Sequence, residues 1–150
     1  MTNHTRNTTT GLKFEKKTKI VRDGVDVSKG KFKRYIEEHG GQMGNWQRQP
    51  DAAFIWPEDK ELVVYEKKFQ TTKGSADEKL AAGPFILSQY RKMAKTIEIP
   101  PERVSLIYIL SDYFRASKYI ELLEFLEENG VMYVFWSDEE DRERMLNYRV

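Results

Sequence analysis

Three side chains near the middle of the chain, Asp51, Glu66 and Lys68, are of types that together can hold a divalent cation and activate water. Two carboxylates held close together repel each other unless a cation lies between them, and Mg²⁺ binds through one or two carboxylates while keeping several waters. An ammonium group beside that ion can orient or deprotonate a water and stabilise developing negative charge. The alternative interpretation is a surface salt-bridge set worth less than about 1 kcal/mol.

A β-hairpin is the element that would bring these side chains together. The β-rich runs 51–56 and 62–70 flank residues 57–61, which have turn character. Antiparallel pairing about that turn places Asp51 opposite residues 66–67. The sequence therefore predicts that the carboxylates of Asp51 and Glu66, fifteen residues apart, lie within a few ångströms of each other.

Alternation along the second strand gives it two faces of different character. One face carries Leu62, Val64, Glu66, Lys68 and Gln70. The other face, which is plausible core, carries Val63, Tyr65, Lys67 and Phe69. Because the first face begins apolar and then changes to acid, base and amide, we expect this strand to run out of the core into a polar cleft.

The remaining elements surround the hairpin in a regular order. A short helix is predicted over 28–40, with Ser28 as its N-cap. Ser75 to Glu78 matches a capping box, and Gly83-Pro84 interrupts the helix that starts there before a second run over 85–97. An apolar strand, an amphipathic helix, a second strand and a charged tail with helical character then follow, at 104–114, 117–129, 131–136 and 138–150. This order predicts an α/β chain with one mixed sheet and helices packed against it.

Composition excludes several classes of protein. The 150 residues contain no Cys and two His, which excludes disulfide scaffolds, thiolate metal sites and most histidine-based acid–base chemistry. Hydrophobic residues make up 39%, enough for a core, and no apolar run approaches the roughly 20 residues of a membrane span. We expect a soluble, cytoplasmic protein with no membrane partner, in which residues 1–10 are a disordered tail and 11–150 a single domain.

The net charge of +1 hides a gradient along the chain. Residues 1–50 hold eleven Lys and Arg against five Asp and Glu, whereas residues 96–150 hold six against twelve. Such asymmetry is a hint of a face that binds a polyanion, and an unevenly charged solvated surface is the alternative.

The string Gln49-Pro50-Asp51, with Glu66-Lys67-Lys68 following on the next strand, resembles the signature of the PD-(D/E)xK nuclease superfamily. The resemblance covers about residues 28–136. The continuation through residues 66–70 and 74–80 resembles, more narrowly, a group of Type II restriction endonucleases. This resemblance implies a restriction-endonuclease-like mixed β-sheet flanked by helices, with an αβββαβ-type core.

The resemblance also implies a Mg²⁺-dependent endonuclease and, more narrowly, the sequence-specific Type II kind that acts on duplex DNA, with Mn²⁺ able to replace Mg²⁺. Asp51 and Glu66 would ligate the metal, and Lys68 would serve the attacking water. Many members carry a further Glu on the first helix. Here the segment begins Lys29-Gly30-Lys31, so Glu15 is the candidate if its stretch is helical and folds over the site. A chain this short has no room for a separate recognition domain, so cutting both strands predicts a homodimer.

Seven other residues are predicted to contact or support the DNA: Gln70, Lys73, Lys79, Gln89, Arg91, Lys92 and Arg48. Gln70 shares the strand face of Glu66, although a strand-end amide in a turn network is an equal alternative. Some relatives place a Gln that helps to position DNA where Gln89 stands, and a polar residue on an amphipathic helix is the alternative. The basic residues could track phosphates, and Arg48 belongs to a loop with side chains for base-edge contacts.

Three rival functions remain open at the level of sequence. A structure-specific nuclease such as a Holliday junction resolvase shares this fold and size and would cut four-way junctions. A homing endonuclease would have a long target site. A non-catalytic nucleic-acid-binding module would use the acidic cluster only as structure.

Overall fold

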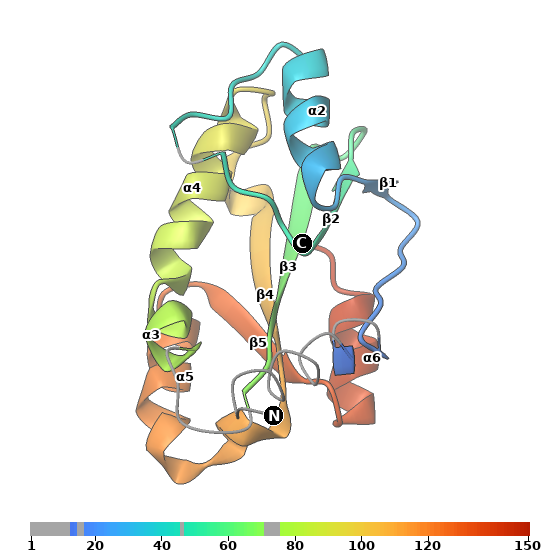
Figure 1. Cartoon of the computed structure of the whole chain (residues 1–150). Coiled ribbons are helices and arrows are strands. Elements are labelled where there is room, and N and C mark those ends of the chain that lie inside the picture. The colour runs from blue at the N-terminus through green and yellow to red at the C-terminus, as the bar shows by residue number, and fades with distance from the viewer. Residues whose placement is uncertain (1–12, 15–16, 46, 71–75) are drawn as a thin grey trace, which may run out of the picture.

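The computed structural model describes residues 13–14, 17–45, 47–70 and 76–150. In this part of the chain the strands form one sheet (Figure 1) and are β1 (Val25–Asp26), β2 (Ala52–Trp56), β3 (Glu61–Lys68), β4 (Val104–Leu110) and β5 (Val131–Phe135). The α-helices are α2 (Gly30–Glu38), α3 (Ala76–Ala81), α4 (Gly83–Lys95), α5 (Ile120–Glu128) and α6 (Glu139–Leu146). The 3-10 turns are η1 (Pro101–Arg103), η2 (Asp112–Arg115) and η3 (Ser117–Tyr119).

The sheet is mixed, with the strands in their sequence order from β1 to β5. β1, β2 and β3 are antiparallel neighbours, whereas β3, β4 and β5 run parallel. Ala52 pairs with Tyr65 and Trp56 with Glu61, so the hairpin turns where the sequence predicts. The prediction of an α/β chain with a mixed sheet flanked by helices is therefore confirmed.

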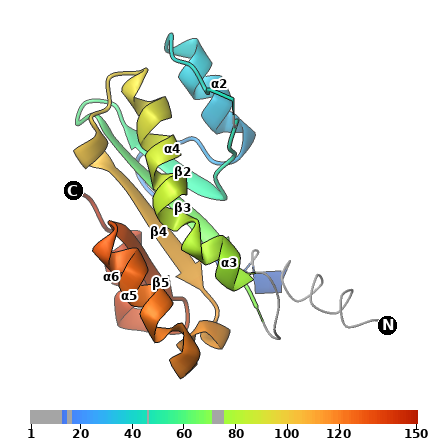
Figure 2. The same ribbon diagram turned by 90° about the vertical axis from the view of Figure 1, so that its left-hand side faces the viewer.

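Both parallel connections lie on one face of the sheet. The chain returns from β3 to β4 through α3 and α4, and from β4 to β5 through α5, because a parallel neighbour needs a crossover. α2 packs on the same face next to α4, where the Phe32 and Tyr90 rings meet edge to face at 5.4 Å (Figure 2). The core on this face joins side chains of α2, α4 and α5 to the sheet, for example Ile36, Leu87 and Leu126.

α6 and the segment before β1 cover the opposite face. Tyr65 and Ile107 belong to the buried cluster there, and Leu146 of α6 packs against it. The Tyr65 hydroxyl donates to the Met145 carbonyl (2.8 Å), and Arg22 donates to Tyr65 Oη (3.0 Å). The sheet is thus buried on both faces, as the run of seven buried residues in β4 requires.

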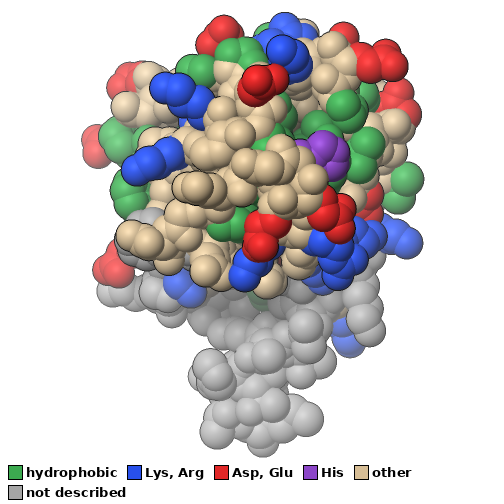
Figure 3. Space-filling view, turned by 90° about the horizontal axis from the view of Figure 1, so that it is seen from above, with side chains coloured by type: hydrophobic (Ala, Val, Ile, Leu, Met, Phe, Trp, Pro, Cys, Tyr) green, Lys and Arg blue, Asp and Glu red, His purple; other side chains and the backbone are tan. Residues whose placement is uncertain are grey.

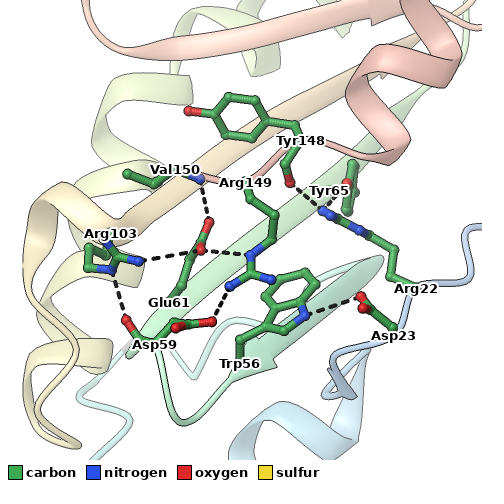
Figure 4. Close-up of polar contacts among 10 residues, drawn as sticks. All are labelled: Arg22, Asp23, Trp56, Asp59, Glu61, Tyr65, Arg103, Tyr148, Arg149 and Val150. Atoms are coloured by element: carbon green, nitrogen blue, oxygen red, sulfur yellow. Dashed lines mark hydrogen bonds and ion pairs between the residues drawn. The ribbon is translucent and has the colours of Figure 1, made fainter.

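An ionic network at the start of β3 joins distant parts of the chain (Figure 4). The fully buried Glu61 carboxylate accepts hydrogen bonds from Arg149 Nε (2.8 Å) and from the Val150 backbone (2.7 Å). Arg103 Nη2 lies 3.8 Å from the same carboxylate. The Arg149 guanidinium also lies over the Trp56 ring, 4.1 Å from its centroid. The last residues of the chain are thereby fixed against the hairpin.

Two predicted details of the local structure are wrong. Ser28 does not cap α2, because its Oγ instead accepts a hydrogen bond from the Ala53 backbone (3.1 Å); Lys29 is the N-cap residue and has φ of 52°. β3 ends at Lys68 rather than Gln70, since Ser111 Oγ bonds both the backbone N–H and the carbonyl of Gln70 (3.2 Å each) in place of a strand partner.

The strand that follows also ends earlier than predicted. β4 stops at Leu110, and η2 takes up the residues as far as Arg115. The predicted helix over 117–129 is present as η3 followed by α5, and Gly130, with φ of +80°, ends it as expected. The charged tail is helical at α6.

None of the helices in the described part of the chain combines the length and the apolarity needed to cross a bilayer. The predicted tail, residues 1–10, lies outside the described residues. So does Ser75 of the capping box; α3 begins one residue after it.

Candidate active site

The hairpin places Asp51 against the far end of β3. Asp51 directly precedes β2, and Asp51 Oδ2 accepts a hydrogen bond from the Lys67 backbone N–H (2.7 Å). Continuing the register one step beyond the Ala52–Tyr65 pair sets Asp51 opposite Glu66. The structure therefore brings together the carboxylates of Asp51 and Glu66, as the sequence predicts, because this register sets Asp51 opposite Glu66.

Glu66 is a buried acid, with 7% of its surface exposed. Its side chain lies on the sheet face covered by α4, where the Tyr90 hydroxyl donates to Glu66 Oε1 (3.1 Å). Burial, helped by the charge and the hydrogen bond of Asp51, raises the pKa of Glu66 to about 8, against the opposite effects of Lys68 and Tyr90. Near neutral pH the Glu66 carboxyl therefore holds a proton unless a cation replaces it.

Tyr108 lies beside Glu66 on the next strand. The parallel register pairs the two residues, and Lys68 Nζ lies 6.0 Å from the centroid of the Tyr108 ring. Burial, and then the charge of Glu66, raise the pKa of the Tyr108 hydroxyl, so it stays protonated. This buried hydroxyl has no hydrogen-bond partner among the described residues.

Arg48 and Gln89 extend the cluster towards the loop before β2. Arg48 Nε donates to Gln89 Oε1 (2.8 Å). The charge of Arg48 also acts on Tyr90 and Tyr108, lowering the pKa of each against the larger effect of burial. The predicted residues Arg48 and Gln89 are thus joined to each other by a hydrogen bond, and Arg48 is linked electrostatically to Tyr90 and Tyr108, the two tyrosines beside Glu66.

The donor set fits a hard divalent cation held by two carboxylates. Asp51 and Glu66 supply anionic oxygens, and their mutual repulsion in a buried place favours a cation between them. In the described residues no group of three or more His, Cys, Asp or Glu is arranged to hold a metal. Glu15, the predicted third ligand, lies outside the described residues.

The remaining predicted residues are dispersed. Lys92 lines a groove next to Gln89. Lys79 is exposed on α3. Arg91 is not brought to the carboxylate pair, because its Nε donates to the Pro101 carbonyl (3.0 Å), at the opposite end of β4 from Tyr108. Gln70 is half-buried and its backbone is held by Ser111. Lys73 lies outside the described residues.

The charge gradient of the sequence does not give one continuous basic surface at the α2 end. Figure 3 looks onto this end and shows Lys and Arg side chains interspersed with Asp and Glu. The local positive charge that matters for the site is instead that of Lys68 and Arg48.

Two residues of the site, Tyr90 and Tyr108, are absent from the sequence-based set of site residues. Tyr108 belongs to an apolar strand, so its sequence context predicts a core residue. It is adjacent to Glu66 only because β3 and β4 pair in parallel in this register. For Tyr90, the sequence feature that could have indicated a place at the site is its position next to Gln89, on the helix that follows the hairpin.

No protein-family model matches the chain, and no solved structure gives a significant match to it.

Proposed function

We propose that the chain is a Mg²⁺-dependent endonuclease that hydrolyses phosphodiester bonds of DNA. The observation that carries this proposal is the buried Glu66 carboxyl, held beside Asp51 and followed on the same strand face by Lys68. Two carboxylates and a lysine at the exit of a strand are suited to bind a metal and to stabilise the charge of a phosphoryl transition state. Buried titratable groups with shifted pKa values that lie beside a second charged group are frequent at functional sites, which supports this assignment.

The roles of the side chains follow from their positions. Asp51 and Glu66 would hold Mg²⁺, which when bound polarises the phosphate and lowers the pKa of water. Tyr90 orients the Glu66 carboxyl through its hydrogen bond. Lys68, whose charge acts on Glu66 and whose Nζ lies 6.0 Å from the centroid of the Tyr108 ring, would stabilise the charge that develops on the phosphate oxygens. Mn²⁺, which also prefers oxygen ligands, would replace Mg²⁺.

A restriction-endonuclease-like fold and a sequence-specific Type II activity on duplex DNA are the finer part of this proposal. Support for the fold comes from the order of helix α2, hairpin β2–β3, a helical crossover and the parallel strand β4, with the proposed catalytic residues on the hairpin. Cutting both strands would require a homodimer, in which each subunit supplies one site.

The test is cleavage of unmodified plasmid and phage DNA with Mg²⁺, compared with the same reaction in EDTA. We expect discrete fragments with Mg²⁺ only. Asp51→Asn, Glu66→Gln and Lys68→Ala should each lower the cleavage rate by roughly 10²-fold or more while the far-UV circular dichroism is unchanged. The control variants Glu58→Gln and Lys95→Ala change exposed residues away from the site and should cleave at the wild-type rate.

Other outcomes identify the rivals. Cleavage of four-way junctions with no cleavage of linear duplex would indicate a resolvase, and fragments explained only by one long target would indicate a homing endonuclease. DNA binding with no cleavage of any substrate, unaffected by Glu66→Gln, would show a binding module and overturn the proposal.

A further inference from the structure

A cavity of about 450 Å³ lies beyond the start of β3, away from the candidate active site at the other end of that strand. The end of α2, the end of α4 and the hairpin turn meet there, at the top of Figure 1. Part of its lining is apolar, because it includes Ile55 and Ile99, which are almost completely buried. The volume is within the roughly 300–1,000 Å³ of typical small-molecule pockets, so the cavity can take a small molecule with an apolar part.

Two stacked aromatic rings contribute a further part of the lining. The rings of Tyr35 and His39 have centroids 3.9 Å apart and planes inclined by 18°. A hydrogen bond of 2.8 Å, which His39 Nδ1 donates to the Tyr35 carbonyl, holds the two residues together. A third ring adds favourably to such a stack, in an offset or an edge-to-face arrangement. This lining therefore suits a ligand whose apolar part is aromatic.

Two side chains of opposite charge also line the cavity. Lys60 comes from the hairpin turn and Glu98 from the segment that follows α4. Within the described residues, neither side chain takes part in an ion pair, with the other or with a third residue. The ammonium group and the carboxylate are therefore both available to a ligand, which sets this pair apart from the arginines and acids of the Glu61 network.

Both charged residues occupy backbone positions that favour glycine. Lys60 has φ of 51° and Glu98 has φ of 65°, in the left-handed region. The Glu98 N–H donates to the Lys95 carbonyl (3.1 Å). The Ile99 N–H donates to the Ala94 carbonyl (3.0 Å), which completes the motif that commonly ends a helix with glycine. Backbone conformations of this kind cluster at ligand-binding sites, so their occurrence twice on one cavity supports a use for the two side chains.

We propose that this cavity binds a free α-amino acid with an aromatic side chain. Lys60 binds the carboxylate of the ligand, Glu98 binds its ammonium group, and the aromatic side chain lies against the stacked rings and the isoleucines. A ligand with a single charge would leave one of the two charged residues without a partner, and for this reason a zwitterion fits better than an anion or a cation. The inference does not depend on the proposed nuclease activity.

Binding is tested by NMR of the isoleucine methyl groups, with L-phenylalanine as the probe. We expect a saturable shift of the signals of Ile97 and Ile99, which line the cavity, and unchanged signals of Ile107 and Ile109, on the opposite face of the sheet. Phenethylamine lacks the carboxylate and 3-phenylpropanoate lacks the ammonium group, so each should bind at least about tenfold more weakly. The absence of a saturable shift, or an equal affinity for all three ligands, would overturn the inference.

The role of each charge is tested with glycine variants, which remove the side chain and fit the backbone. Lys60→Gly and Glu98→Gly should therefore unfold in urea at or above the wild-type midpoint. Each should bind L-phenylalanine at least about tenfold more weakly. Lys60→Gly should leave the affinity for phenethylamine unchanged, and Glu98→Gly that for 3-phenylpropanoate.

The matched control is Lys29→Gly. Lys29 is also an exposed lysine with a positive φ, 52°, but it belongs to the start of α2 and not to the lining of the cavity. This variant should bind L-phenylalanine as the wild type does. An unchanged affinity for L-phenylalanine in Lys60→Gly or in Glu98→Gly would refute the assignment. Because the assay contains no DNA, its failure would leave the proposed nuclease function standing.

Discussion

At the scale of residues, the site has a feature that stability alone does not explain. Two tyrosine hydroxyls are buried near Glu66. That of Tyr90 is paired with the Glu66 carboxyl, whereas that of Tyr108 has no partner in the described part of the chain. A folded protein rarely keeps an unpaired buried hydroxyl without a function for it. Because Tyr108 is fully buried, any influence of its hydroxyl on the site acts through the neighbouring Glu66 carboxyl and not through contact with substrate.

Tyr108→Phe should accordingly make the protein more stable and less active. The change removes an unpaired hydroxyl, so the free energy of unfolding in urea should rise by about 1 kcal/mol, while the cleavage rate falls. Tyr90→Phe provides the contrast, because it removes a hydroxyl that is paired and should lower the free energy of unfolding. If Tyr108→Phe lost stability and kept full activity, the hydroxyl would have only a structural role.

The raised pKa of Glu66 predicts that metal binding depends on pH. Below about pH 8 the carboxyl holds a proton in the folded protein, and a cation must displace it. The apparent affinity for Mg²⁺ should therefore rise about tenfold per pH unit from pH 6 to 8 and then level off. Titration calorimetry in buffers of different ionisation enthalpy measures the released proton directly. Glu66→Gln should remove the proton release, and an unchanged release in this variant would place it on another group.

The same pKa determines how stability changes with pH in the absence of metal. Glu66 has a pKa of about 8 when folded and an ordinary value near 4.5 when unfolded. The stability associated with its protonated form is fully present below about pH 4.5 and is lost as the pH rises through 8. Urea unfolding at pH 5 and at pH 8 should show a larger loss for wild type than for Glu66→Gln. Equal losses would mean that Glu66 titrates normally.

At the scale of elements, the hairpin was predictable because its evidence is local. Strand alternation and the turn over residues 57–60, between β2 and β3, fix which residues face each other, and hence the Asp51–Glu66 pair. What the sequence could not show depends on segments far apart. The predicted Ser28 cap was wrong because the Ser28 hydroxyl accepts a hydrogen bond from the Ala53 backbone in β2 instead. Tyr108 lies beside Glu66 only because α3 and α4 connect β3 to β4 as parallel neighbours.

The position of α2 against α4 depends on one close approach. A Cβ on Gly41, just after α2, would lie 2.6 Å from both Ile97 and Thr96 and 2.9 Å from Ile36. Gly41→Ala should therefore cost about 1–3 kcal/mol of unfolding free energy, as overpacking does. Gly30→Ala, at the other end of the same helix, meets nothing within 4 Å and is the matched control, with an expected change within about 0.5 kcal/mol. Equal effects of the two changes would contradict this packing.

At the scale of the whole molecule, the Glu61 network joins the hairpin, η1 and the last residues (Figure 4). The Glu61 carboxylate is fully buried. The stability of the folded protein therefore depends on the arginines that compensate its charge, Arg149 and Arg103. Arg149→Leu should lower the free energy of unfolding by about 2–3 kcal/mol, below the roughly 3–5 kcal/mol of an isolated buried charge because Arg103 remains. Arg144→Leu breaks an exposed pair with Asp141 and should cost less than about 1 kcal/mol.

Removing both arginines should lower the free energy of unfolding by more than the sum of the two single substitutions. With Arg149 absent, Arg103 is the cation nearest to Glu61 in the described network, and with both absent the carboxylate is left buried and uncompensated. The double variant Arg103→Leu, Arg149→Leu should therefore show a coupling of about 1 kcal/mol or more in urea unfolding. Adding Glu61→Gln to the double variant should restore part of the loss, because it removes the charge that lacks a partner. Strict additivity would mean that the two arginines act on the fold independently, through their stacking and backbone contacts.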